Sequence, residues 1–307
     1  MYRILILFTL MFILIFIWYN YSSKVVGFIY NPLTNAEAYL AEAHSGMYLI
    51  PANIEGDLEK IFRNFASGGV KFLIGPSTSA DGKMILPYLG KYNMVSLSPT
   101  ISSPRLLKSG YIYSLTPSND SIVEAFENYL SKIGTKNLLL VLDDTNKEYS
   151  DDFKRLLETF PGSFVYYNNP SSLKDVKIQD YDTAVITTFS KPSIEIITLL
   201  KYSNTLIQCI ATEASFNDDF LTMGGRFVEG TLLIVPRFDA TDTELDFINE
   251  WVELLLTRRF ISIDQFRRFI MSSTIRVGDR FVYFTPSGVS QEIGLYVVEN
   301  GQFKEVQ

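Results

Sequence analysis

Residues 70–79, Val70-Lys-Phe-Leu-Ile-Gly-Pro-Ser-Thr-Ser79, contain the pattern that decides the fold of this chain. Val70–Ile74 is apolar apart from Lys71 and predicts a buried strand. Gly and Pro then end the strand, and the three hydroxyl residues that follow are of the kind that begins helices. A strand that leads through a polar turn into a helix is the repeating step of a parallel α/β sheet.

The same step recurs along the chain. The predicted strands are Val25–Tyr30, Met47–Ile50, Val70–Ile74, Met94–Leu97, Leu138–Leu142, Phe164–Tyr167, Ala184–Thr188 and Leu206–Ala211. The predicted helices are Ala36–Ala43, Leu58–Phe65, Lys83–Leu89, Ser121–Ile133, Phe153–Phe160, Ile194–Lys201, Glu244–Thr257 and Asp264–Ile270. Nearly continuous apolar strands are typical of parallel sheets that helices cover on both faces. Near the end, Arg280–Phe284, a turn and Glu292–Val298 predict an antiparallel finish.

Composition excludes several classes of function. The chain has 307 residues, 47% of them apolar and 20% charged, which suits one large domain or two lobes and excludes disorder. A net charge of −7 argues against a nucleic-acid binder. One cysteine (Cys209) and one histidine (His44) leave little material for a catalytic triad or a zinc site. We therefore expect a binding protein, not an enzyme, with no cofactor, no catalytic residues and no metal site.

The N-terminus is strongly apolar. Ile4–Trp18 is interrupted only by Thr9, and extending the run to Tyr21 brings it within the roughly 17–25 residues of a spanning helix. A cleaved signal peptide is the alternative, although no small-x-small cleavage site follows. We expect residues 1–23 to be a signal-anchor or signal peptide that contacts the membrane through residues 4–21. The remainder would then be extracytoplasmic, in the periplasm or at the cell surface.

Four loops that follow predicted strands are rich in small polar or acidic residues. They are Gly75–Ser79, Ser98–Pro104, Asp143-Asp144 with Tyr149, and Thr212–Ala214. Ligands of parallel α/β sheets gather at the carboxyl ends of strands. Hydroxyls and backbone N–H groups at helix starts suit a carboxylate, and a glutamate suits an ammonium group. This pairing predicts recognition of a zwitterionic amino acid.

In this order, these segments resemble the type I periplasmic binding protein superfamily, in particular the branched-chain amino-acid substrate-binding proteins of ABC transporters. The stretches that carry the resemblance are Phe72–Ser79, Met94–Pro99, Ser103-Pro104, Tyr111–Pro117, Leu138–Asp144 with Tyr149, Phe227–Gly230, Val235-Pro236, Phe284–Gly288 and Tyr296–Lys304. Together they span nearly everything from Lys24 onward. The resemblance implies two Rossmann-like α/β lobes with parallel-sheet cores, joined by several crossovers. Residues 24–117 with 239–290 would form lobe 1, and residues 118–238 with 291–307 would form lobe 2.

The resemblance also implies a set of ligand contacts. The ligand carboxylate is expected at Ser79 and the backbone near Ser77, helped by Ser102. The other expected contacts are Tyr149, which closes over the ligand from lobe 2, Phe189 or Ser190, and Glu213 for the ammonium group. Each has a structural alternative. The serines also suit helix caps and turns, and Tyr149 also suits a surface position. The acidic residues Asp143, Asp144, Asp151 and Asp152 lack the spacing of a calcium loop and suit a solvated cluster.

Two departures from the family fall in lobe 1. The segment Asn31–Gly46 is short, and Val252–Gln265 leaves no room for the family's long loop and helix. Two functions therefore stay open. The chain would be a solute-binding protein that closes two lobes around a small ligand, an amino acid or similar compound, for an ABC permease. Alternatively, it would be a membrane-anchored interaction or regulatory module of the same fold that binds an envelope protein.

Overall fold

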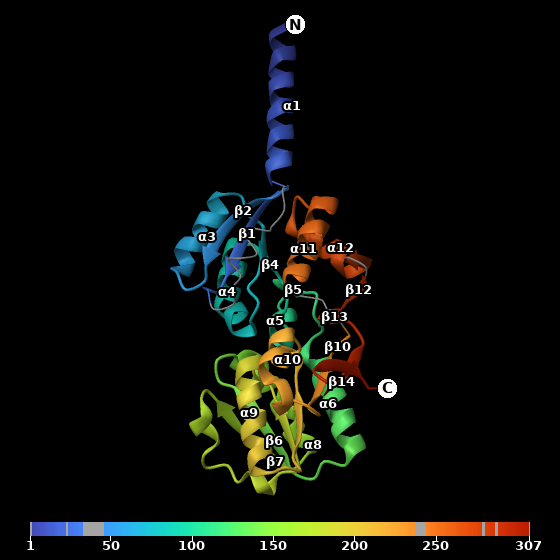
Figure 1. The fold of residues 1–307 in the computed structure, drawn as a ribbon. Coiled ribbons are helices and arrows are strands. Elements are labelled where there is room, and N and C mark those ends of the chain that lie inside the picture. Colours follow the sequence, from blue (N-terminus) through green and yellow to red (C-terminus); the bar gives the residue numbers. More distant parts are fainter. Residues whose placement is uncertain are drawn as a thin grey trace. The chain divides into compact units, whose positions relative to one another are not determined.

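The computed structural model describes residues 2–22, 24–32, 46–237, 244–277, 280–285 and 288–306 (Figure 1). The chain divides into two compact units. Unit 1 comprises residues 1–101, 105–115 and 242–290, and unit 2 comprises residues 102–104, 116–241 and 291–307. Each unit has its own sheet and its own core.

The first helix, α1, spans Tyr2–Ser22. Its described side chains, such as Ile4, Phe12 and Ile17, are apolar and exposed. Counted over the described residues, none of the helices has the length and apolar character needed to cross a membrane. The signal or anchor role expected for residues 1–23 stays a prediction from the sequence.

Unit 1 is built on five parallel strands in the order β2-β1-β3-β4-β5. The strands are β1 (Val25–Tyr30), β2 (Tyr48–Asn53), β3 (Phe72–Ile74), β4 (Val95–Ser98) and β5 (Ile112–Ser114). Its helices are α3 (Leu58–Ser67), α4 (Ser79–Tyr92), α11 (Glu244–Arg258) and α12 (Ile263–Ser272), and the short α5 (Pro104–Leu107) begins at the unit boundary. The sequence predicted four of these strands and missed β5, which is only three residues long.

Alternation along β3 explains why helices cover both faces of this sheet. Leu73 belongs to the core that includes Phe62 and Phe65 of α3. Its neighbour Phe72 lies against Phe266 of α12, with ring centroids 5.3 Å apart. Successive strand residues point to opposite faces, so both faces of an apolar strand need a cover. Figure 1 shows α3 and α4 on one side of the sheet and α11 and α12 on the other.

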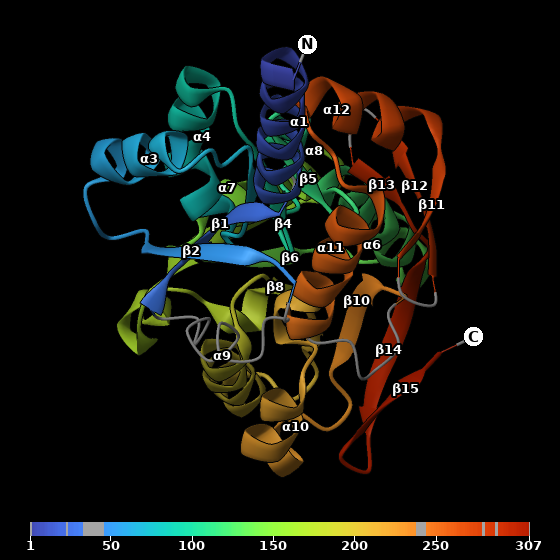
Figure 2. The same ribbon diagram turned by 90° about the horizontal axis from the view of Figure 1, so that it is seen from above.

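Unit 2 contains a seven-stranded sheet in the order β15-β14-β10-β9-β8-β6-β7. The strands are β6 (Leu138–Asp143), β7 (Gly162–Tyr167), β8 (Thr183–Ile186), β9 (Gln208–Ala211), β10 (Leu232–Pro236), β14 (Ile293–Glu299) and β15 (Gln302–Glu305). Its helices are α6 (Asn119–Ile133), α7 (Lys147–Ser150), α8 (Leu156–Thr159), α9 (Ser190–Ser203) and α10 (Asp218–Gly224). β6 to β10 are parallel, and β14 and β15 extend the sheet antiparallel, side by side with β10 in Figure 2.

The core of unit 2 follows the same alternation. Leu139 and Val141 of β6 face a cluster built with α9 and α10, whereas Leu140 and Leu142 face one built with α6 and α8. Figure 1 shows α9 and α6 on opposite sides of this sheet. The parallel sheets expected from the continuous apolar strands, with helices on both faces, are confirmed in each unit.

The antiparallel finish predicted for the C-terminus is only partly correct. β12 (Arg280–Thr285) pairs with β11 (Thr274–Val277) and β13 (Gly288–Ser290) in a small sheet of unit 1. β14 instead pairs with β10 and β15. The prediction joined β12 and β14 because they are neighbours in sequence, but the chain passes from unit 1 to unit 2 between them.

Two predicted helices differ from the structure or cannot be compared with it. Phe153–Phe160 was expected to be one helix, but a 3₁₀ turn over Asp151–Arg155 precedes the four-residue α8. The helix expected over Ala36–Ala43 lies outside the described residues.

Candidate functional site

Both units present the carboxyl ends of parallel strands arranged in the same order. In unit 1 the order is β2-β1-β3-β4-β5, and the parallel part of unit 2, β7-β6-β8-β9-β10, repeats it. In such sheets the strand order reverses beside the first strand, and ligands bind in the crevice at that point. In these two sheets, the strand order therefore favours ligand binding at the loops after β1 and β3 and at those after β6 and β8.

In unit 1, Ser77 is engaged by a carboxylate of the chain itself. Its hydroxyl donates a hydrogen bond to Oε1 of Glu244, the first residue of α11. The backbone oxygen of Ser77 accepts from Oγ1 of Thr100, at 2.7 Å. Burial raises the pKa of Glu244, and the bond from Ser77 partly offsets this effect. No local sequence pattern indicates this contact, because Glu244 lies 167 positions further along the chain.

Ser79 begins α4 and is buried, but it is not the cap of that helix. Thr78 is the cap, and its side-chain oxygen accepts from the backbone N–H of Asp81 at 3.1 Å. The buried carboxylate of Asp81 in turn accepts from Nδ2 of Asn31, which follows β1, at 3.1 Å. The turn after β3 thus gathers hydroxyls and a carboxylate at the point where the strand order reverses.

In unit 2, Asn119 connects two of the predicted site residues. Its backbone N–H donates to the carbonyl oxygen of Ser102, at 2.8 Å. Its side-chain Nδ2 donates to the carbonyl oxygen of Tyr149, at 3.1 Å, and to Oδ2 of Asp152, at 2.8 Å. Because both amide hydrogens are used, the remaining atom, Oδ1, can only accept a hydrogen bond. Sequence reasoning missed Asn119, whose only signal was its place at the start of a helix.

Tyr149 and Glu213 are electrostatically coupled. Burial raises the pKa of the Glu213 carboxyl to about 7. Burial also raises the pKa of Tyr149 well above its ordinary value, and the charge of Glu213 adds to this rise. Both residues lie at carboxyl ends of strands, with Glu213 after β9 and Tyr149 in α7, which follows β6. The structure therefore brings together Ser102, Tyr149 and Glu213, three of the predicted residues.

Six side-chain atoms of unit 2 are buried and have no hydrogen-bond partner among the described residues, and one of them is Gln291 Oε1. The other five are Ser102 Oγ, Asn119 Oδ1, Tyr149 Oη, Thr212 Oγ1 and Glu213 Oε2, and we call them the polar cluster. An unpaired buried polar atom costs about 1–3 kcal/mol, so native proteins keep few of them. Atoms gathered at the carboxyl edge of a parallel sheet are suited to binding a polar ligand.

Phe189 caps α9 and is 45% exposed. Within the described part of the chain, no ring contact or hydrogen bond joins its side chain to the polar cluster. The neighbouring Ser190 donates through Oγ to Oδ1 of Asn217, at 2.7 Å. A ligand contact at Phe189 stays a prediction.

The acidic residues after β6 have local roles. The carboxylate of Asp143 accepts from Thr145 and from the backbone N–H of Asn146, which closes the turn. Asp144 pairs with Lys147. Across the described ranges, no three side chains of the kinds that hold metals lie together. Cys209 is buried, which raises its pKa to about 12, and His44 lies outside the described residues.

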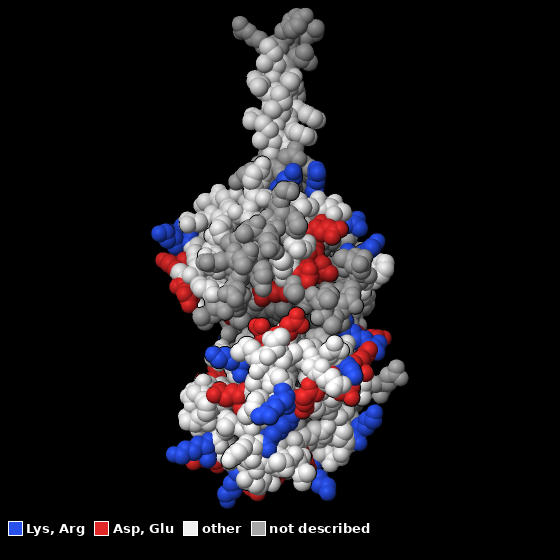
Figure 3. Space-filling model, viewed as in Figure 1, with Lys and Arg blue, Asp and Glu red and all other residues white. Residues whose placement is uncertain are grey.

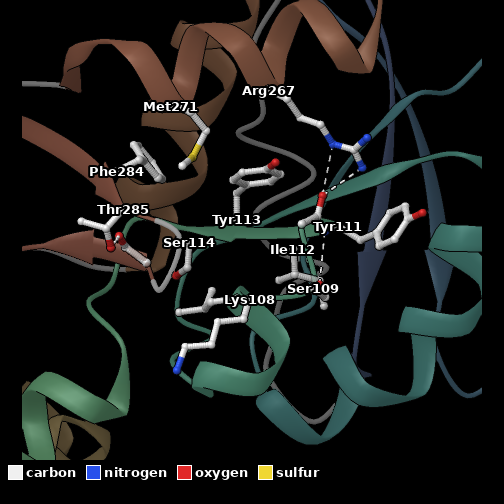
Figure 4. A pocket seen from close by; sticks show the side chains of 13 residues that line it. Lys108, Ser109, Tyr111, Ile112, Tyr113, Ser114, Arg267, Met271, Phe284 and Thr285 are labelled. Atoms are coloured by element: carbon white, nitrogen blue, oxygen red, sulfur yellow. Dashed lines mark hydrogen bonds between the residues drawn. The ribbon is translucent and has the colours of Figure 1, made fainter.

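A separate pocket of about 460 Å³ lies within unit 1 (Figure 4). Its lining consists of Leu107, Lys108, Ser109, Gly110, Tyr111, Ile112, Tyr113, Ser114, Arg267, Met271, Phe284, Thr285 and Gly288. The guanidinium of Arg267 donates to the carbonyl oxygen of Gly110 and lies 5.2 Å from the ring centre of Tyr111. The predicted site residues do not line this pocket.

On the face of unit 2 seen in Figure 3, acidic and basic side chains alternate over the surface. Exposed side chains of unit 2 also form ion pairs, such as Arg155 with Asp120 and Lys304 with Glu299. Such exposed pairs contribute little to stability.

Comparison with known proteins shows similarity at the level of structure. No model of a known protein family matches the sequence, and no curated protein matches it. A leucine-binding protein LivK from Thermotoga maritima has a TM-score of 0.74 at 11% identity, covering 92% of this chain and 98% of that one. An ABC transporter substrate-binding protein from Desulfitobacterium hafniense, in complex with Leu, has a TM-score of 0.65 at 18% identity, with 92% and 99% covered.

A third similar structure is the branched-chain amino acid transporter substrate-binding protein LivJ from Streptococcus pneumoniae, in complex with isoleucine. Its TM-score is 0.73 at 12% identity, with 92% of this chain and 99% of that chain covered. Identities this low establish the fold alone. The chain has the type I periplasmic binding protein fold found in amino-acid substrate-binding proteins of ABC transporters.

Proposed function

We propose that this chain is an extracytoplasmic solute-binding protein that takes a small ligand with an ammonium group, an amino acid or a similar compound, for an ABC transporter. The observation that carries the proposal is the polar cluster of unit 2. Its five atoms are buried and have no hydrogen-bond partner in the part of the chain that the structure describes, and a ligand would supply the missing hydrogen bonds. The similar structures, two of them with Leu or isoleucine bound, support the same class of function.

The expected roles follow from the chemistry of each side chain. Glu213 would accept hydrogen bonds from the ammonium group, and Tyr149 and Ser102 would supply hydroxyls beside it. Ser79, Phe189 and the backbone near Ser77 are further proposed contacts. The mechanism would be a shift in population: a ligand that contacts both units only in the closed state stabilises that state. The proposed role contains no catalytic step.

One observation favours the second candidate, an interaction or regulatory module that binds an envelope protein. The hydroxyl of Ser77, in the turn whose backbone the family resemblance assigns to a ligand, is bound to Glu244 of the same chain. A predicted ligand-binding turn that already binds a carboxylate of the same chain would suit a protein that no longer transports a solute. Under this reading, capture of an envelope partner would not depend on any small ligand.

A thermal-shift screen of the purified full chain tests the first proposal. Amino acids and related amines, each at millimolar concentration, should include at least one compound that raises the melting temperature, because ligands that bind only the folded state stabilise it. Glu213→Gln should abolish the shift. Glu253→Gln, an exposed glutamate on α11, should leave it unchanged. If no compound shifts the wild-type chain, the first proposal is wrong and the second becomes the better one.

A further inference from the structure

Two carboxylates lie at the carboxyl ends of the unit 1 strands, and the described groups that contact them are neutral. Asp81 accepts from the amide of Asn31, and Glu244 accepts from the hydroxyl of Ser77. Neither carboxylate forms an ion pair with any described residue. Both lie beside the loops after β1 and β3, where this strand order favours ligand binding. The edge is therefore negative and without an internal counter-charge among the described residues.

The carboxyl ends of the unit 2 strands also carry acidic side chains and hydrogen-bond acceptors. Among the described residues, the carboxylate of Asp143 accepts hydrogen bonds from Thr145 and Asn146 alone. In the polar cluster, Glu213 Oε2 and Asn119 Oδ1 are buried without partners, and Asn119 is fully buried. An ionised carboxylate and an amide oxygen accept hydrogen bonds and cannot donate them. Asn119 Oδ1 needs a donor, and so does Glu213 above its pKa of about 7, where a cationic donor would also neutralise its charge.

At the carboxyl ends of the unit 1 strands, a free carboxylate on the ligand would have no counter-charge from the described residues named above. It would lie near the carboxylate of Glu244, and like charges side by side are unfavourable whenever that carboxylate is ionised. It would also compete for the hydroxyl of Ser77, which Glu244 already holds. An ammonium group, with three donors and a positive charge, satisfies the acceptors of either edge.

We propose that the preferred ligand is a cation without a free carboxylate, a primary amine or an amino-acid amide. This inference rests on the proposed solute-binding function and narrows its ligand class. It differs from the zwitterionic ligand that the sequence predicted. The physical cause is that Glu244, contributed by α11, holds its carboxylate on the Ser77 hydroxyl, in the turn where the ligand carboxylate is expected.

Four probes of similar shape separate the two ligand classes. Isothermal titration of the full chain would compare L-leucine, L-leucine amide, 3-methylbutylamine and 4-methylpentanoate at the same pH and ionic strength. The amide and the amine should bind at least about tenfold more tightly than leucine, which corresponds to one decade in Kd. The carboxylate 4-methylpentanoate should give no detectable heat of binding.

A charge-removing variant then tests the assigned cause. Glu244→Gln keeps an acceptor for Ser77 and removes the charge, so the preference for leucine amide over leucine should fall by at least about fivefold. Glu253→Gln, exposed on the same helix, should leave the preference unchanged. Circular dichroism and the melting temperature would verify that both variants fold. Because the ranking of the four probes on the wild-type chain is a test in itself, a poorly folded variant leaves the inference falsifiable.

The outcomes distinguish a failure of the inferred ligand class from a failure of the solute-binding proposal. If leucine binds as tightly as its amide, or if Glu244→Gln leaves the preference unchanged, the inference is wrong while the solute-binding proposal stands. If none of the four probes binds and the wider screen also finds no ligand, the solute-binding proposal fails and the inference fails with it.

Discussion

The indole Nε1 of Trp251 donates a hydrogen bond of 3.1 Å to the backbone oxygen of Ser98, 153 positions earlier in the chain. Trp251 is fully buried in α11, and Ser98 ends β4. The ring also packs near Phe266 and Phe284, at centroid distances of 6.5 and 6.0 Å. One side chain thus connects the C-terminal part of unit 1 to the carboxyl edge of its sheet.

Two substitutions of Trp251 should destabilise unit 1 to different extents. Trp251→Phe removes the indole donor and should cost about 1–3 kcal/mol, because it leaves a buried acceptor with one bond fewer. Trp251→Ala also creates a cavity and should cost about 3–5 kcal/mol. Urea unfolding followed by circular dichroism measures both. Glu253→Gln, exposed on the same helix, should change the free energy of unfolding by less than about 0.5 kcal/mol. A loss below 1 kcal/mol for Trp251→Ala would contradict the role assigned to this residue.

Glu213 should make the unliganded protein less stable as the pH rises. Its pKa in the folded state is raised to about 7 from an ordinary 4.5. The folded state therefore keeps the proton over a range where the unfolded state releases it. The stabilising contribution is fully present below about pH 4.5 and is lost as the pH rises through about 7. Glu213→Gln removes this titration.

The Gln variant should match the wild type near pH 4.5 and exceed it by on the order of 2 kcal/mol at pH 8. Urea unfolding of both chains between pH 4.5 and 8, without ligand, measures the difference. A constant difference across this range would show that Glu213 does not titrate as assigned.

Thr78 and Ser79 should differ in their effect on stability. Thr78 caps α4 through its side-chain oxygen, so Thr78→Ala should cost about 1 kcal/mol. Ser79 follows the cap, and Ser79→Ala should cost less while weakening ligand binding if its proposed contact is correct. Melting temperatures of the two variants provide the comparison. A larger loss for Ser79→Ala would mean that the capping assignment is wrong.

Gly27 of β1 should not tolerate a side chain. A Cβ atom at this position would lie 2.6 Å from Cδ2 of Leu73 and 3.2 Å from Cζ of Phe65, inside the core of unit 1. Gly27→Ala should therefore cost about 1–3 kcal/mol through overpacking. Gly90→Ala, on α4 with its nearest neighbour atom 3.8 Å away, should be neutral or stabilising because alanine favours helices. Equal effects of the two substitutions on the unfolding midpoint would contradict this packing argument.

Much of the fold could be predicted because its information is local. Continuous apolar runs such as Leu138–Leu142 identified buried strands, and helical spacing identified Ser121–Ile133. The short strand β5 (Ile112–Ser114) escaped because three residues carry too little pattern. The pairing of β14 also escaped, because strand partners depend on contacts between distant segments.

The sequence by itself determined the parallel α/β class and the polar loops at the strand ends, since residue types and their spacing decide local structure. It also indicated Ser102, Tyr149 and Glu213, which the structure brings together. Only the tertiary structure placed Glu244 on Ser77 and Asn119 beside Tyr149. Those contacts join segments far apart in the chain, and no local pattern encodes which buried acceptors remain without a donor. For that reason the sequence predicted a zwitterionic ligand, whereas the contacts of the folded chain led us to propose a cation.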